Sequence, residues 1–155
     1  MTSQATTDPT TEPALAAWAA LLRAHASATR ALNAELVAEH GLTINDYEAL
    51  LLLSRASEHG LRRVDLASEL CLSASGVTRL LEGLERAGYV EKAACPEDAR
   101  VTYAVLTDGG RAKLQAAACG HVASIRALFE RFSQTELEAL AELLARLPNG
   151  DTYTP

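Results

Sequence analysis

Aromatic residues are scarce in this chain of 155 residues: phenylalanine, tryptophan and tyrosine together make up 5% of it. Leucine and alanine therefore have to build most of the core, which favours helices. No apolar run approaches the roughly 20 residues of a membrane-spanning helix, so we expect no membrane partner. With 48% hydrophobic and 22% charged residues, the composition is typical of one globular domain with a buried core.

Cysteines and histidines are few, and neither set forms a recognisable site. Cys71, Cys95 and Cys119 are expected to be free thiols, and no two of the four histidines have the i, i+4 spacing of a helical metal site. A nucleophile–base pair and a phosphate-binding loop are also lacking. The sequence therefore predicts no enzyme, no metal site and no cofactor. A pairing of His25 with His121 across two helices stays open as an alternative.

Basic residues are outnumbered, with 14 Lys and Arg against 20 Asp and Glu and a net charge of −6. The distribution is uneven, because eight residues of each sign lie between Leu61 and Lys113. This segment is neutral, and the rest of the chain carries the whole negative charge. This uneven distribution of charge suits DNA binding by the neutral segment. We expect the binding to use a few arginines at specific positions and to weaken as the salt concentration rises.

Two helical patterns joined by a short turn lie inside the neutral segment. Apolar residues occupy one face of each pattern: Leu66, Ala67 and Leu70 before the turn, and Val77, Leu80, Leu81 and Leu84 after it. Small or polar residues point the other way: Ser73, Ser75, Thr78 and Arg79. This pattern predicts a helix-turn-helix whose second helix packs on the protein by one face and enters the major groove of DNA by the other.

The chain before this unit predicts two helices. The first runs from Pro13 to about His40, and its apolar seam from Leu15 to Leu36 has the heptad-like spacing that requires a partner helix. Thr43 should cap the second helix, with Asp46 near its free N–H groups. We expect that helix to end at His59–Gly60.

The chain after this unit predicts a hairpin and two more helices. Strands are expected at 89–92 and 101–106, around a loop at 93–100. Thr107 should cap a helix that runs to about Arg131. Ser133 and Glu136 should form a capping box for a last helix that ends near Leu147.

These elements predict a mainly α fold with a small β-wing, a winged helix-turn-helix flanked by long terminal helices. We expect long terminal helices at 13–40 and 107–147, a DNA-binding lobe at 41–106, a disordered N-terminal tail at 1–12 and a C-terminal tail at 148–155. The polar, Thr-rich N-terminus has no basic or apolar region, so it is typical of a tail rather than a signal peptide. A cytoplasmic protein is therefore expected.

Five segments, in this order and spacing, resemble the MarR family, the multiple-antibiotic-resistance type of bacterial regulator: Asp65–Ala67, Ser73–Leu84, Ala87–Lys92, Pro96–Arg100 and Leu106–Gly110. The resemblance implies a homodimer, held by the first and the last two helices, that binds a pseudo-palindromic DNA operator. It also implies repression, with release by a small ligand, an oxidant or a metal. The chain departs from the family pattern at two positions, with Cys71 where glycine is frequent and Lys92 where arginine is frequent.

The expected DNA contacts divide by the part of DNA they would meet. Ser75, Thr78 and Arg79 are predicted to face bases, and Ser73 to cap the helix, contact a phosphate, or do both. The alternative for Arg79 is a solvated pair with Glu82 or Glu85. The remaining expected contacts are Arg62 and Arg63 with phosphates, Lys92 in the wing, and Arg100 in a minor groove with Asp98 holding its guanidinium.

The resemblance places a ligand cleft between the dimerisation helices and the lobe, with Trp18, His25, Tyr47 and Arg55 as candidate lining residues. A small aromatic or phenolic effector is implied there, although Trp18 and Tyr47 are also ordinary core aromatics. Such an effector would act by favouring one spacing of the two lobes. Two alternatives stay open: a thiol-based redox-sensing regulator acting through Cys95, and a winged helix that contacts proteins without binding DNA.

Overall fold

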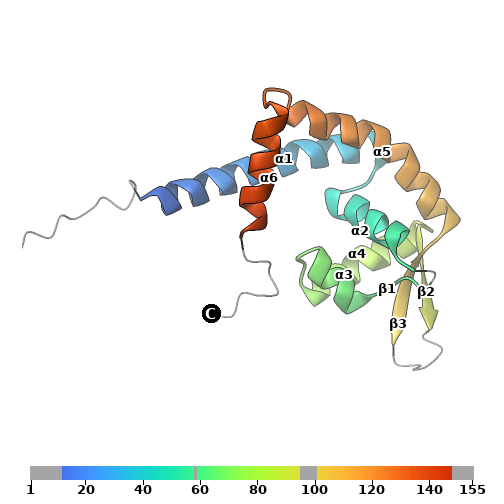
Figure 1. Ribbon diagram of the computed structural model, residues 1–155. Helices are drawn as coiled ribbons and strands as arrows, with labels where there is room; N and C mark the ends of the chain where they lie inside the picture. Colours follow the sequence, from blue (N-terminus) through green and yellow to red (C-terminus); the bar gives the residue numbers. More distant parts are fainter. Residues whose placement is uncertain (1–11, 58, 95–100, 148–155) are drawn as a thin grey trace, which may run out of the picture.

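The computed structural model describes residues 12–57, 59–94 and 101–147. Two terminal helical segments stand away from a compact lobe that holds the middle of the chain (Figure 1). The elements follow in the order α1 (Pro13–His40), α2 (Ile44–Arg55), β1 (Leu61–Arg62), α3 (Arg63–Glu69), α4 (Ala74–Arg86), β2 (Val90–Ala94), β3 (Thr102–Leu106), α5 (Asp108–Leu128) and α6 (Gln134–Ala145).

The helix starts are set by local side-chain caps. The Thr43 hydroxyl accepts from the Asp46 N–H, which confirms Thr43 as the cap of α2, and the Asp46 carboxylate accepts from the Thr43 N–H to complete a capping box. A second box joins Ser133 and Glu136 at α6, and Thr107 accepts from the Gly110 N–H at α5. These three predictions are confirmed because a cap needs only residues close in sequence.

Two helix ends and one strand differ from the sequence-based predictions. α2 ends at Arg55, because Ala56 already has an extended backbone, and α5 ends at Leu128 rather than Arg131. Between α2 and α3, Leu61 and Arg62 form a short strand that the sequence did not predict, and Arg62 is also the N-cap residue of α3. A two-residue strand has no periodicity of its own and exists only through its pairing with β3.

The sheet is antiparallel with the order β1-β3-β2. Leu61 pairs with Ala104 on one side of β3, and Lys92 pairs with Ala104 on the other. Gly60, which precedes β1, has a φ of +78°, and a Cβ there would collide with the carbonyl oxygen of Ala104. The predicted two-stranded wing is therefore a three-stranded sheet that ties the start of α3 to the hairpin.

The core lies in the lobe, where Leu42, Leu50, Leu66 and Val77 are fully buried. The outer helices are less covered, and α5 lies along the second half of α1 (Figure 1). α6 has no buried residue in the single chain. Of the helices in the described ranges, none is long and apolar enough to cross a bilayer.

Candidate nucleic-acid interface

Helix α4 has one buried face and one polar face. Val77, Leu81 and Leu84 are buried in the core, whereas Ser75 and Arg79 are exposed. The Ser73 hydroxyl accepts from the Gly76 N–H at 3.1 Å, which confirms Ser73 as the N-cap. The helix is thus anchored by its apolar side, and its first turns present polar side chains to solvent as a recognition helix requires.

The turn before α4 depends on Cys71, whose φ is +51°. The N–H of Cys71 bonds to the carbonyl of Ser68, and the N–H of Leu72 bonds to that of Ala67, so both ends of the turn are tied to α3. A side chain in the left-handed region costs about 1–2 kcal/mol. Cys71, whose thiol is exposed, thus adopts the left-handed conformation at the position where the family pattern favours glycine.

The predicted base-facing residues differ in how much hydrogen-bonding capacity is left to them. Thr78 donates its hydroxyl to the carbonyl of Ala74 at 2.9 Å and accepts a long bond of 3.4 Å from Arg63. The hydroxyls of Ser73 and Ser75 lie 3.2 Å apart. Arg79 forms no ion pair with any residue in the described part of the chain. Its guanidinium is therefore the most available donor on this face.

The other basic side chains are partly paired within the protein. Arg62 binds Asp65 through two bonds of 2.8 Å, and these bonds hold the pKa of the Asp65 carboxyl below its usual value. Lys92 of β2 forms an ion pair of 2.9 Å with Glu85 of α4. The sequence analysis considered Glu85 only as a partner of Arg79, because a pairing across the turn at Gly88 has no periodic signal.

The tip of the wing lies outside the described residues. It contains Asp98 and Arg100, the predicted minor-groove pair, and Cys95, a predicted free thiol and the residue on which the redox-sensing alternative depends. All three assignments stay predictions. The two cysteines that are described, Cys71 and Cys119, are free and exposed.

The four candidate ligand residues lie in different environments. Tyr47 is 6% exposed in the core, whereas Trp18 is 57% exposed, and His25 and Arg55 are also exposed. Arg55 is near enough to Tyr47 for its charge to oppose the rise in the Tyr47 pKa that burial causes. Across the described ranges, no three His, Cys, Asp or Glu side chains converge as a metal site would need.

Tyr47 instead packs against His121 of α5, which the sequence analysis did not single out for the core. The two rings have centroids 4.4 Å apart. Burial lowers the pKa of the His121 imidazole, and the charges of Glu35 and Glu48 oppose that shift. This contact joins α2 of the lobe to α5.

Comparison with known proteins gives consistent matches. The sequence pattern of the MarR family matches residues 42–102. The HTH-type transcriptional repressor YetL of Bacillus subtilis is 33% identical over 110 residues, covering 71% of this chain and 66% of YetL, just under two thirds of its length. The crystal structure of AbsC, a MarR family transcriptional regulator from Streptomyces coelicolor, has a TM-score of 0.80 at 32% identity, covering 89% of this chain and 93% of AbsC. Sco3205 from the same organism, solved in complex with DNA, has a TM-score of 0.79 at 27% identity, covering 84% of this chain and 86% of Sco3205.

A recognition helix held by its apolar face beside an antiparallel hairpin defines a winged helix-turn-helix protein. Given the 32% identity to AbsC across 93% of that protein, the chain belongs to the MarR family. It is a DNA-binding transcriptional regulator and not an enzyme. DNA binding is therefore favoured over the alternative of a winged helix that contacts only proteins.

Proposed function

We propose that this chain is a homodimeric repressor that binds a pseudo-palindromic operator and is released by a small effector. The observation that carries the proposal is α4, with its buried Val77, Leu81 and Leu84 and its exposed Arg79, which has no ion-pair partner among the described residues. Two such helices, one from each protomer, would enter major grooves one helical turn (roughly 34–36 Å) apart. Ser75, Thr78 and Arg79 would meet the bases, and the wing with Asp98 and Arg100 would reach the flanking minor grooves.

The second protomer is inferred from apolar surface left on the terminal helices. Leu15, Trp18 and Leu22 of α1 are 45%, 57% and 48% exposed, and Leu143 of α6 is 58% exposed. Exposed apolar surface of this extent on helices that stand away from the core is typical of a dimer interface. Residues 13–40 and 107–147 would form that interface as dimerisation helices, as the resemblance to the MarR family implies.

The proposed effector site depends on the dimer. A small aromatic or phenolic ligand would lie among Trp18, His25, Tyr47 and Arg55 only if the dimer brings the exposed members to the buried Tyr47. The support in the single chain is the closeness of Arg55 to Tyr47. Titration of such compounds into the protein–operator complex tests release directly.

Fluorescence anisotropy tests the DNA-binding part of the proposal. The protein should bind duplex DNA from its own upstream region more tightly than a scrambled duplex. Arg79→Ala should cost about 1–3 kcal/mol on the operator alone, because a bidentate arginine–guanine contact discriminates between bases by that amount. Arg131→Ala removes the same charge outside the lobe and should change affinity little. Equal losses for both variants, or equal binding to both duplexes, would contradict the proposal.

A further inference from the structure

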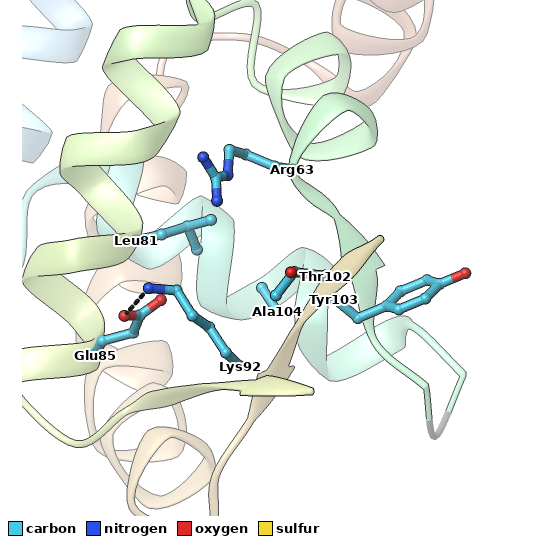
Figure 2. Close-up of a pocket in the computed structure, with 7 residues that line it drawn as sticks. All are labelled: Arg63, Leu81, Glu85, Lys92, Thr102, Tyr103 and Ala104. Atoms are coloured by element: carbon cyan, nitrogen blue, oxygen red, sulfur yellow. Dashed lines mark ion pairs between the residues drawn. The ribbon is translucent and has the colours of Figure 1, made fainter. Parts of the chain in front are cut away.

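Between the recognition helix and the wing lies a hollow that the DNA-contact predictions did not anticipate. It is shallow and open to solvent, and it is bounded by α3, α4, β2 and β3. Leu81 and Ala104 contribute apolar side chains to its wall. Figure 2 shows the guanidinium of Arg63, the ammonium of Lys92 and the hydroxyl of Thr102 around this space, whereas the ring of Tyr103 points away.

The charged groups around the hollow do not cancel. Arg63 and Lys92 supply two positive charges, and Glu85 supplies one negative charge at 2.9 Å from the Lys92 ammonium. The Arg63 guanidinium bonds within the described residues only to the neutral Thr78 hydroxyl, at 3.4 Å. One positive charge is therefore left uncompensated. A guanidinium, an ammonium and a hydroxyl facing one space are the donors that bind phosphate groups in proteins.

The position of the hollow indicates which phosphate it would take. Major and minor grooves of a duplex are separated by one sugar–phosphate strand. A protein that inserts α4 into the major groove and its wing into the neighbouring minor groove has to straddle that strand. The hollow lies between these two elements (Figure 2).

We propose that the hollow receives a backbone phosphate of the operator, held by Arg63, Lys92 and Thr102, and that Glu85 competes with this phosphate for Lys92. The inference rests on the DNA binding proposed above. Glu85 is the more enclosed partner of the ion pair, with its side chain 22% exposed against 54% for Lys92. Lys92 is thus the partner with freedom to turn toward DNA, and the protein–DNA bond replaces an internal ion pair. Glu85 thereby weakens binding to every duplex, whatever its base sequence.

Removal of the Glu85 charge should tighten DNA binding. E85Q keeps the shape of the side chain and releases Lys92. The affinity for DNA should rise roughly three- to tenfold, because the variant loses both the competing ion pair and the repulsion between the Glu85 carboxylate and the phosphate. Because a phosphate contact carries no sequence information, operator and scrambled duplex should gain equally. The slope of log affinity against log salt should stay close to the wild-type slope, because Lys92 contacts the same phosphate in both proteins and the slope follows the number of phosphate contacts.

The matched control is Glu91, the neighbour of Lys92 on β2. Successive residues of a strand face opposite sides, and Glu91 is exposed and absent from the hollow. E91Q removes the same charge from the same hairpin, so its effect on affinity should stay below about twofold, as for a screened surface charge. E85Q/K92M should lose the gain in affinity, and its salt slope should be shallower than the wild-type slope by about 0.9, because it lacks the ammonium that contacts the phosphate. Circular-dichroism melting verifies that each variant is folded.

The experiment is anisotropy of the full chain and these variants on both duplexes over a salt series. A wild-type chain without operator preference would overturn the proposed function. A wild-type chain with operator preference, together with identical curves for E85Q and E91Q, would overturn the inference about the hollow alone. Titration with inorganic phosphate separates DNA phosphate from a free anion as the ligand. Saturable phosphate binding that E85Q strengthens, without any gain on DNA, would also overturn it.

Discussion

His121 is the one polar residue buried in the part of the chain that the structure describes, and it lies where the lobe meets α5. Its ring is 7% exposed and packs on Tyr47. The charges nearest to it come from Glu35 of α1 and Glu48 of α2, yet burial dominates and lowers the pKa of His121 below its usual value of 6.5. The neutral imidazole is therefore the form that the folded protein favours.

Stability should fall when the pH drops below 6.5. In that range the unfolded chain protonates His121 more readily than the folded chain does, so the unfolded state binds more protons and the free energy of unfolding rises with pH. The stability is complete above the unfolded pKa and is lost as the pH falls toward the lowered folded pKa. His121→Phe keeps a ring against Tyr47 and should flatten this dependence in urea unfolding at a series of pH values.

The control for this prediction is His59→Phe, because His59 is exposed. It should retain the pH dependence of the wild-type protein. If His121→Phe and wild type lose stability in parallel on acidification, another group is responsible.

Single residues also show where sequence reasoning succeeds and where it stops. Ser73 was predictable as a cap because its partner, Gly76, is three residues away. The ion pair of Glu85 with Lys92 could not be predicted from the sequence, because it depends on how the hairpin folds back on α4. The burial of His121 likewise depends on the packing of α5 on α2, which no local pattern specifies. Long-range contacts of this kind decide which of the predicted basic residues remain free.

At the scale of elements, α5 is attached to the base of the wing through its first residues. The Thr107 hydroxyl donates to the carbonyl of Gly88 at 2.7 Å, and the Thr107 N–H donates to the carbonyl of Tyr89 at 3.1 Å. Gly110 is buried, and a Cβ there would collide with the carbonyl oxygen of Tyr89 and with Leu106. The helix therefore contacts the hairpin backbone directly.

Gly110→Ala should destabilise the protein by about 1–3 kcal/mol, the usual cost of overpacking. The nearest obstacle to the added methyl group is the backbone of Tyr89, and the Leu106 side chain lies next to it. Gly109→Ala is the matched control, because its nearest obstacle is the Gly88 carbonyl oxygen at 3.3 Å and alanine is the better helix former by about 1 kcal/mol. Urea unfolding should separate the two variants, and equal stabilities would show that α5 can shift away from the hairpin.

The elements themselves were largely readable from the sequence. Caps and amphipathic spacing located the helices and the hairpin, and the predicted fold class is confirmed. The missed strand β1 shows the limit: Leu61 and Arg62 are extended only because β3 offers them a free edge. With Arg62 in this strand and bound to Asp65, its predicted phosphate contact would require breaking two hydrogen bonds.

At the scale of the whole molecule, the proposed dimer makes a clear prediction. Leu143→Glu should raise the dissociation constant of the dimer by more than about tenfold, because burial of a leucine contributes about 1.5–3 kcal/mol in each protomer. Val64→Glu introduces the same charge at a valine that is 66% exposed in the lobe and should leave the dimer intact. Sedimentation equilibrium measures both. A dimer that tolerates Leu143→Glu would place the interface elsewhere.

The junction of α5 with the wing has a consequence for protein engineering. A chimera that exchanges DNA-binding lobes between relatives, and is cut at the apparent boundary near Thr107, would separate Gly88 and Tyr89 from the residues of α5 that fit against them. The unit to be exchanged is therefore longer than the lobe and extends through Gly110. A graft that carries the segment from Gly88 to Gly110 intact preserves the contact between α5 and the hairpin.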